Sequence, residues 1–341
     1  MFLYLTTDGL VISKEWGRFL VRNPLSQEDN EQQIPISLVE GMVIFGRIQL
    51  TTDVIRACLK GNIPVFFLSK TGTFFGKLDS LEAKNVDLLY SHIQASLNPE
   101  IALRYAKSII SAKLHNSKVM LQRWARFYPK PSRDLTKYQQ SLDALQTSLQ
   151  DSVTLEAVRW LEGLWARVYF EAFGKCIPAP FSFTGRNRRP PKDPVNSLLS
   201  LGYTLLAQTI EMILNVQGIE TQIWFIHQPK DLKSLLVLDI MEMFRAWIVD
   251  DMVVRLLENK KLTLDDFYLD EENEKRPVLL LDDGLKVVLE EYYRVIFKQK
   301  GTSAVPYEND FIKLKIIEKH LETFKQSLFK KTYEYEGFKI K

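Results

Sequence analysis

Short apolar runs, several of them alternating with polar residues, fill the first eighty residues of the chain. Alternation of this kind is typical of β-strands with one buried face. The runs lie at 2–7, 9–14, 18–23, 33–38, 41–46 and 63–69. Turn-forming residues such as Asp8-Gly9 and Gly41 separate them. One short helix is predicted at 51–62, where Gly61 is placed to end it.

The spacing of apolar residues changes to the helical period after Leu81. Asn98-Pro99 supplies a capping side chain and a first-position proline, and Asp193-Pro194 repeats this combination. Helices are predicted at about 99–128, 135–150, 151–173, 194–217, 234–258 and 310–330. The chain therefore begins as β structure and continues as helices.

These periods predict an α+β protein with a β-rich N-terminal domain, a sheet with one short helix, at 1–80. A linker is expected at 81–97, followed by a mostly α-helical domain at 98–341. Two segments interrupt the helical pattern. A proline-rich basic loop spans 178–194, and an acidic segment at 262–284 is predicted to hold a small hairpin.

Composition places the chain among globular proteins, with 46% apolar and 26% charged residues. No run of eighteen uncharged apolar residues exists, so we expect no membrane-spanning helix and no membrane partner. The N-terminus has no basic region and carries Asp8, which is unlike a signal peptide. Cys58 and Cys176 lie far apart and are expected to be reduced core residues of a cytoplasmic protein.

The net charge of +3 is unevenly distributed. Between Ile101 and Gln140 there are nine Lys or Arg residues and one acid, Asp134. Such an excess of positive charge would attract a polyanion such as nucleic acid. The alternative is a solvated helix face whose partners are acidic residues elsewhere in the fold.

Glu162 occupies an apolar helix face, between Val158 and Ala166. A carboxylate in that setting must be neutralised, paired with a cation or bound to a metal ion. An ion pair with Arg159, or with a basic residue of another helix, would satisfy it without a metal.

A second acidic pair lies in an equally apolar helix. Asp239 and Glu242 are three residues apart and therefore adjacent on its surface, and His227 precedes them after an apolar run. Neighbouring carboxylates repel each other, and a bound divalent cation relieves that repulsion. A lone histidine is commonly a satisfied core residue, but a histidine together with three carboxylates favours a metal site. Such a ligand set suits Mg²⁺ or Mn²⁺, with Zn²⁺ possible, and beside a basic surface it favours action on a phosphodiester.

Several blocks carry a resemblance to a known family, in the same order along the chain. They are IPISLVEGMVIFGRIQLTTDVIRACLKGNIPVFFLSKTGTFFGKL, LEGLWARVYFEAF, GRNRRPPKDPVNSLLSLGYTLL, and IWFIH followed by SLLVLDIMEMFR. Together they resemble the CRISPR-associated integrase-nuclease, the first of the two universal CRISPR adaptation proteins. The chain departs from the family pattern at QPKDLKS after His227, where a Gly-Arg pair is common, and at Ala246, where proline is usual.

The resemblance implies that Glu162, His227 and Glu242 bind the metal ion and act in catalysis. Asp239 either supports the site from behind or takes a second ion. The DNA-binding residues implied are Arg186, Arg188, Arg189, Lys192, Asn196, Tyr203 and Arg245. Two alternatives stay open for them: the basic loop is a plain solvated loop, and Asn196 and Tyr203 are structural.

The resemblance further implies a homodimer that works with a small ferredoxin-like second adaptation protein. Short duplex DNA fragments would be inserted into the CRISPR array when a fragment's 3′-hydroxyl attacks a phosphodiester. Branched DNA would be cut when water takes the place of that hydroxyl. Two other functions compete with this one: a non-catalytic nucleic-acid scaffold of the same fold, and an unrelated helical metallohydrolase.

Overall fold

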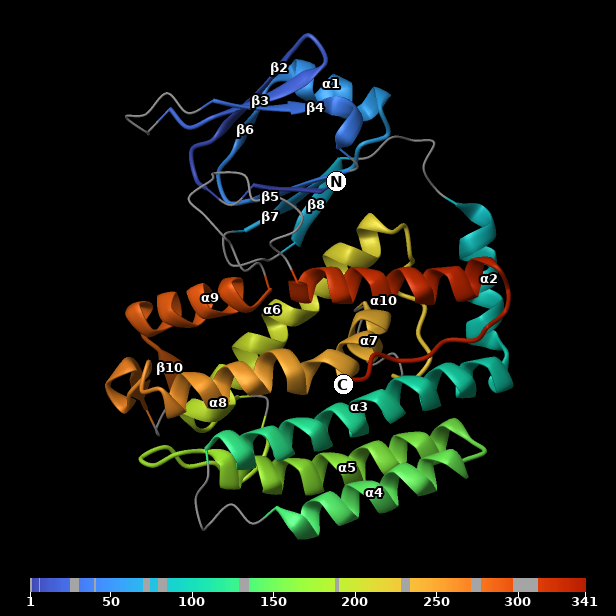
Figure 1. Cartoon of the computed structure of the whole chain (residues 1–341), viewed down its shortest axis with the longest axis vertical. Helices are drawn as coiled ribbons and strands as arrows, with labels where there is room; N and C mark the ends of the chain where they lie inside the picture. Colours follow the sequence, from blue (N-terminus) through green and yellow to red (C-terminus); the bar gives the residue numbers. More distant parts are fainter. Residues whose placement is uncertain are drawn as a thin grey trace.

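The computed structural model describes residues 2–5, 7–24, 31–39, 41–69, 74–78, 85–128, 135–187, 190–227, 234–270, 277–296 and 312–341. Within these residues, a β-rich N-terminal part lies at one end of the molecule and a larger helical part makes up the rest (Figure 1). The predicted α+β fold class is therefore confirmed.

The β-rich part contains two four-stranded sheets rather than one. Its strands are β1 (Phe2–Leu5), β2 (Val11–Glu15), β3 (Arg18–Arg22), β4 (Gln32–Pro35), β5 (Gly41–Phe45), β6 (Gln49–Leu50), β7 (Val65–Leu68) and β8 (Phe74–Leu78). One sheet has the order β1-β5-β7-β8, with only β8 antiparallel, and the other has the order β4-β3-β2-β6. A 3₁₀ turn, η1 (Ile36–Leu38), follows β4, and helix α1 (Thr52–Lys60) ends at Gly61 as predicted.

The helical part follows the predicted periodicity closely. Its helices are α2 (Val86–Leu97), α3 (Pro99–Phe127), α4 (Thr136–Gln150), α5 (Leu155–Cys176), α6 (Pro194–Val216), α7 (Leu235–Arg245), α8 (Asp251–Glu258), α9 (Asp282–Ile296) and α10 (Ile312–Phe329). A π-helical turn, η3 (Ala246–Asp250), joins α7 to α8 and interrupts the helix predicted at 234–258. Helices α2 and α9 were not predicted, and α2 occupies most of the segment expected to be a linker.

The predicted hairpin is present. After the 3₁₀ turn η4 (Leu264–Asp266), strands β9 (Phe267–Leu269) and β10 (Val278–Leu280) pair in antiparallel register. The two cysteines, Cys58 and Cys176, are free and buried, which confirms their expected role as reduced core residues.

The sheet containing β5 and β7 lies between the other sheet and the helices (Figure 1). Successive side chains of a strand point to opposite faces. Met42 and Ile44 therefore join the core of the β-rich part, whereas Val43 and Phe45 join the helical core. The ring of Phe45 packs edge-on against Tyr293 of α9, with centroids 5.9 Å apart. The two parts are thus joined through a common apolar contact.

Helix α3 runs through the helical part and packs against both α5 and α7, the helices that carry the predicted acidic ligands (Figure 1). Its start follows the predicted cap, because the Asn98 side chain accepts hydrogen bonds from the backbone N–H groups of Glu100 and Ile101. Helix α6 is long and apolar enough by composition to span a membrane. In this fold it is a core helix, since 61% of its most apolar window is buried against its neighbours.

Candidate metal centre

Two of the predicted acidic ligands converge on one lysine of α3. The Nζ atom of Lys113 lies 2.5 Å from Glu162 Oε1 and 2.6 Å from Glu242 Oε2, so a single positive charge joins α5 to α7. The lysine side chain is fully buried, Glu242 is 7% exposed and Glu162 is 31% exposed. The ammonium group also lies 4.0 Å from the ring centroid of Trp165, whose electron-rich face attracts a cation.

The cation that satisfies Glu162 therefore comes from another helix and not from Arg159. The Arg159 guanidinium turns away and donates from Nε to the carbonyl oxygen of Ile226, at 2.6 Å. That bond holds the segment just before His227. Arg159 thus contributes to the candidate site by positioning its histidine rather than by neutralising its acid.

Glu242 has a second cationic partner, Arg245, one turn along α7. Arg245 Nη1 lies 3.0 Å from Glu242 Oε2, and the guanidinium carbon lies 4.3 Å from the ring centroid of Tyr203. Burial by itself would raise the pKa of Glu242, but Lys113 and Arg245 hold that pKa well below its usual range. Because Arg245 is only 2% exposed, its placement favours a role inside the site over a contact with DNA phosphates.

Asp239 supports the segment that carries His227. Its fully buried carboxylate accepts backbone N–H bonds from Phe225, Ile226 and His227, at 2.7, 3.0 and 3.1 Å. The His227 Nδ1 atom lies 2.6 Å from the same carboxylate. With four such bonds the lone pairs of Asp239 are engaged, which favours the supporting role over that of a ligand to a second ion.

This contact orients the imidazole. Since an ionised carboxylate only accepts hydrogen bonds, Nδ1 of His227 carries the proton and Nε2 is left to face the site when the ring is neutral. Burial by itself would lower the pKa of His227, but the Asp239 carboxylate, with a smaller contribution from Glu242, raises it above its ordinary value. The side chain is 36% exposed, so the site opens to solvent on the side of His227 and Glu162.

Behind the site lies a buried acid that periodicity did not single out. Asp250, in the π-helical turn η3, accepts hydrogen bonds from the hydroxyl groups of Tyr169 and Tyr203, both at 2.5 Å. Burial raises the pKa of Asp250, an effect that the Arg245 charge and the two tyrosines oppose. The sequence feature that could have identified Asp250 is its position as a charged residue within the apolar run AWIVDDMVV.

Among the residues that the structure describes, no three His, Cys, Asp or Glu side chains lie close enough together to form a metal site. The donor set nevertheless fits a divalent cation. The Lys113 ammonium group stands where a shared positive charge would bind, between Glu162 and Glu242. His227 is held by Asp239, which lies three residues before Glu242 on α7. Two carboxylates and an imidazole oriented by a third carboxylate are ligands suited to Mg²⁺ or Mn²⁺.

The predicted basic loop packs onto the start of α6. Arg186 donates from Nη1 to Asn196 Oδ1 at 2.7 Å and from Nη2 to Ser200 Oγ at 3.0 Å. Asn196 is fully buried and donates to Asp193 and the Gly185 carbonyl oxygen, which is a structural role. Tyr203 is likewise buried. Of the remaining residues predicted to bind DNA, Lys192 is exposed, and Arg188 and Arg189 lie outside the described residues.

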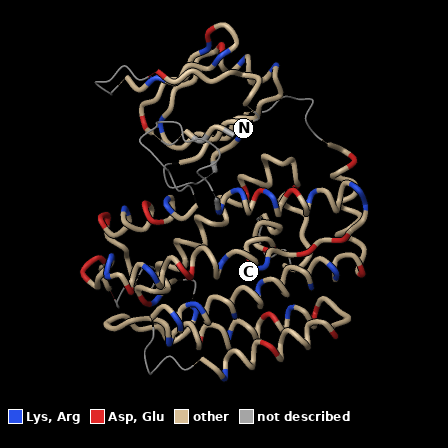
Figure 2. Tube along the Cα trace, in the orientation of Figure 1, with Lys and Arg blue, Asp and Glu red and all other residues tan. Residues whose placement is uncertain are grey.

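The basic segment between residues 101 and 140 is divided between two uses. Lys and Arg positions recur along α3 (Figure 2). Lys113 points into the site, Lys118 pairs with Asp143 at 2.6 Å, and Lys107 donates to backbone carbonyl groups. Arg104 and Arg126 are exposed. The segment is therefore partly a basic surface and partly a set of cations with partners inside the fold.

Known proteins share extended similarity with this chain. The model of the family described as CRISPR associated protein Cas1 matches residues 3–294. A relative from Thermus thermophilus, CRISPR-associated endonuclease Cas1 3, is 34% identical over 266 residues, which cover 78% of this chain and 76% of the relative. CRISPR-associated endonuclease Cas1 1 of Chlorobaculum tepidum is 30% identical over 295 residues, covering 85% of this chain and 84% of the relative.

Solved structures show the same fold. A chain of a partial Cas6-RT-Cas1–Cas2 complex matches with a TM-score of 0.81 at 22% identity, covering 99% of this chain and 98% of that one. A casposase bound to its integration product matches with a TM-score of 0.73 at 22% identity, covering 99% of both chains. The family model covers most of the chain and two relatives are 34% and 30% identical to it, so the chain belongs to the Cas1 family of CRISPR-associated proteins.

Proposed function

We propose that this protein is a metal-dependent DNA integrase and endonuclease of CRISPR adaptation. The observation that carries the proposal is the convergence of Glu162 and Glu242 on one buried cation, next to a histidine held by Asp239. The relatives are named as endonucleases. One structure with this fold is described as a casposase bound to an integration product.

In this proposal Glu162, Glu242 and Nε2 of His227 bind Mg²⁺ or Mn²⁺. The ion would offset the charge of a phosphodiester and promote attack on its phosphorus atom. The protein contributes the geometry around that ion. Asp239 keeps the proton of His227 on Nδ1, and Arg245 holds the Glu242 carboxylate in place from behind.

The proposed reaction exchanges one phosphodiester for another. The 3′-hydroxyl oxygen of a DNA fragment forms a bond to phosphorus while the bond to a deoxyribose oxygen of the array DNA breaks. The attacking hydroxyl loses its proton and the leaving oxygen gains one, so no cofactor is consumed. In cleavage, water replaces the 3′-hydroxyl and the same bond breaks.

The proposed partners follow from the resemblance and from the names of similar structures. One similar chain comes from a complex that contains Cas2, and another, from a protein named TtCas1, comes from a complex with DNA, at a TM-score of 0.59. We propose a homodimer that works in the cytoplasm with the small ferredoxin-like second adaptation protein. Short duplex fragments, branched DNA and the CRISPR array are the proposed DNA ligands.

A joining assay tests the proposal. Purified protein, with and without its partner, is incubated with a short duplex and a supercoiled array plasmid in Mg²⁺, Mn²⁺ or EDTA. We expect joining and nicking with a metal and neither in EDTA. Glu162→Ala and His227→Ala should abolish both reactions while DNA binding survives. Glu290→Gln, which removes an exposed carboxylate of α9, serves as the matched control.

A non-catalytic DNA scaffold is the competing function, and one observation favours it. Lys113 and Arg245 already balance the charges of Glu162 and Glu242, so the cluster is complete without a metal ion. Under that hypothesis, Glu162→Ala and His227→Ala would leave every DNA phenotype intact. No nicking or joining with either metal by the wild-type protein would contradict the proposed enzymatic function.

A further inference from the structure

After α10 the chain turns back and runs along α3 toward α7, drawn in red in Figure 1. We call residues 335–341 of this segment the strap. The strap lies beyond residues 3–294, which the family model matches, and it contains none of the proposed metal ligands. Its backbone is bound by side chains of α3, at two anchors that lie on either side of Lys113.

The first anchor is Ser108. Its hydroxyl group donates to the Tyr335 carbonyl oxygen at 2.6 Å and accepts from the Gly337 N–H group at 2.8 Å. A Cβ added at Gly337 would lie 2.7 Å from the Ser108 carbonyl oxygen and 2.8 Å from Ala112 Cβ. It would also lie 3.0 Å from Met243 Sδ. The strap therefore packs tightly on α3 and α7 at a position where only glycine has room.

The second anchor, Asn116, joins three segments of the chain through one fully buried side chain. Its Nδ2 atom donates to the Met243 carbonyl oxygen of α7 at 2.8 Å and to the Phe338 carbonyl oxygen at 2.7 Å. Its Oδ1 atom accepts from the Ile340 N–H group at 2.8 Å. Both amide hydrogens and the amide oxygen are thus engaged, and they fix α7 and the strap to α3.

The spacing of the two anchors shows that the strap is extended. Ser108 and Asn116 are eight residues apart, which is about 12 Å along the axis of α3. Gly337 and Ile340, which they bind, are three residues apart, which is about 10 Å in an extended chain. The strap therefore has little slack between its anchors.

Asn116 lies beside the candidate metal centre on both of the helices that it joins. It follows Lys113 by three residues on α3, and its partner Met243 directly follows Glu242 on α7. The ion pair between Lys113 and Glu242 and the hydrogen bond from Asn116 therefore join the same two turns. A shift of α7 along α3 would move Glu242 relative to Glu162 on α5.

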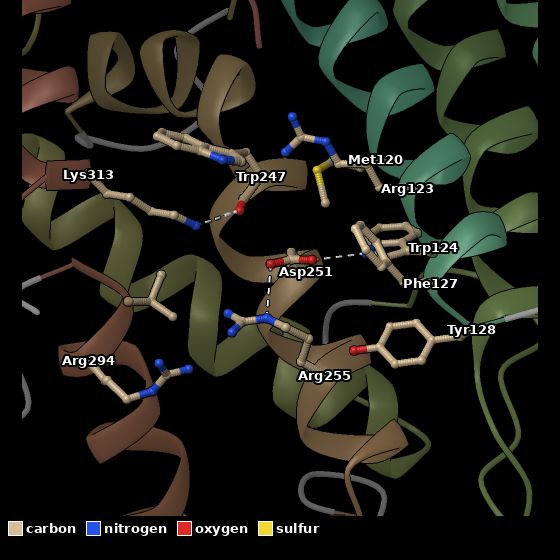
Figure 3. A pocket seen from close by; sticks show the side chains of 11 residues that line it. Met120, Arg123, Trp124, Phe127, Tyr128, Trp247, Asp251, Arg255, Arg294 and Lys313 are labelled. Carbon is tan, nitrogen blue, oxygen red and sulfur yellow. Dashed lines mark hydrogen bonds and ion pairs between the residues drawn. The ribbon is translucent and has the colours of Figure 1, made fainter. Parts of the chain in front are cut away.

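The ring of Phe338 extends this contact to the chain that follows α7. It stacks on Phe244 with centroids 5.1 Å apart and packs on Trp247 of the turn η3 at 4.8 Å. Trp247 is also held by Lys313, whose Nζ atom donates to its carbonyl oxygen at 3.1 Å (Figure 3). The strap thus contacts the chain immediately before and after Arg245, the second cation bound to the acid of α7.

We propose that Asn116 and the strap are positioning elements of the candidate metal centre. They set the place of α7 on α3, and with it the distance between the Glu242 and Glu162 carboxylates, without supplying a ligand themselves. The inference rests on the proposed function, since it requires these carboxylates to bind a metal ion. It adds that a segment far along the chain from every ligand controls the affinity for that ion.

Metal affinity and fold stability respond differently to a displaced carboxylate. Mg²⁺ holds its oxygen ligands at about 2.0–2.1 Å in near-octahedral geometry and tolerates little displacement. The flexible stem of Lys113, in contrast, can follow Glu242 when α7 shifts. Loss of the positioning contacts should therefore weaken metal binding while the ion pair persists.

Asn116→Leu and Gly337→Val test this inference in the full chain. The first removes three hydrogen bonds at similar volume, and the second places a side chain where none fits. Each should weaken Mn²⁺ binding by about tenfold or more, measured by electron paramagnetic resonance of free Mn²⁺ well below the melting temperature. In the double variant the two effects should be less than additive, because both act through the same contact with α7.

Ser108→Ala is a milder variant, because it removes only the first anchor and changes a half-buried side chain. It should weaken Mn²⁺ binding by about threefold, the factor that corresponds to one net hydrogen bond. Thermal melting in EDTA checks the folding of each variant.

Thr209→Val is the matched control. It also removes a buried hydrogen bond, but that bond joins α6 to α9, from Thr209 Oγ1 to the Tyr292 hydroxyl group at 2.7 Å. We expect this variant to melt at a lower temperature than the wild type and to bind Mn²⁺ within about twofold of the wild-type affinity, since distant sites act independently.

The outcomes separate this inference from the proposed function. If the strap variants melt at lower temperature but bind Mn²⁺ as tightly as the wild type, the strap serves only stability and the inference fails, while the proposed function stands. Weakening of Mn²⁺ binding by Thr209→Val as large as that by Asn116→Leu would also refute it, because general destabilisation then explains the effect. If the wild-type protein binds no Mn²⁺, the proposed metal centre and the inference are both wrong.

Discussion

Replacing Lys113 by methionine tests the charge arrangement of the candidate metal centre. Methionine keeps the length of the side chain and can pack on the Trp165 ring, but it removes the cation shared by Glu162 and Glu242. In metal-free protein the two carboxylates then lose their common partner. We therefore expect Lys113→Met to be less stable than the wild type in EDTA.

The magnitude follows from burial. Removing one partner of a buried ion pair costs about 3–5 kcal/mol. Arg245 still contacts Glu242 at 3.0 Å, and Glu162 is 31% exposed and partly hydrated, so we expect the free energy of unfolding to fall by about 2–3 kcal/mol. For a helical domain of this size the melting temperature should fall by roughly 4–12 °C.

The same variant should bind manganese more tightly. In the wild type an entering ion must displace Lys113 from the two carboxylates, whereas in Lys113→Met it need not. A difference of about 2 kcal/mol corresponds to roughly thirtyfold in affinity, measurable by electron paramagnetic resonance of free Mn²⁺. Saturating Mn²⁺ should also restore much of the lost melting temperature.

Lys118→Met is the control, because Lys118 lies on the same helix and pairs with the exposed Asp143 at the surface. Exposed pairs contribute about 0–1 kcal/mol, so this variant should melt close to the wild type. Equal melting of Lys113→Met and wild type in EDTA, with unchanged affinity for manganese, would show that Lys113 is not the counter-cation of this site.

Three further changes test other contacts. Asp239→Asn should lower the pKa of His227, measured by NMR titration, because burial then acts without the opposing carboxylate. The same change should weaken manganese binding by about 10–100-fold, measured by calorimetry. Burial would raise the pKa of Glu291, but its arginine and lysine partners lower it to about 2 from an ordinary 4.5. The ionised carboxylate therefore stabilises the fold above pH 4.5, and this contribution is lost as the pH falls toward 2. At pH 7 the free energy of unfolding of Glu291→Gln should be about 3 kcal/mol lower than that of the wild type. Urea titrations should show this difference in stability shrinking between pH 4.5 and pH 2. Gly202→Ala should cost about 1–3 kcal/mol in thermal unfolding, because the added carbon would lie 2.5 Å from Val249 Cγ1 and force α6 away from η3; an unchanged melting temperature would contradict this packing.

Local signals predicted where several helices begin. The Asn98 and Asp193 side chains bind the first backbone N–H groups of α3 and α6, as their positions before proline indicated. A cap involves residues only a few positions apart, so it can be recognised without knowing the fold. Helix α1 was predicted at 51–62 and spans Thr52–Lys60, but the Thr51 side chain before it makes no capping bond.

Helix α2 shows what local signals miss. It was expected to be a linker, yet Ser91 donates to the Leu328 carbonyl oxygen at the end of α10 and His92 packs against Phe225. Both partners are far away in the sequence, so their contribution could not be foreseen from the segment itself. The stability of a short helix comes mainly from such tertiary packing.

The sequence by itself determined that Glu162, Asp239 and Glu242 lie on apolar faces and need partners, because helical period depends only on spacing. The sequence also placed Lys113 four residues after Ile109, on the helix face that is buried. That lysine was nevertheless interpreted as part of a basic surface.

Only the tertiary structure decided which charges meet. The packing of α5 and α7 on either side of α3 brings two carboxylates to one lysine, and residues more than a hundred positions apart become neighbours. The same packing placed Arg245 inside the site, because its guanidinium is held by Glu242 and the Tyr203 ring. Spacing along one helix specifies a face, whereas the partner of that face depends on how the helices cross.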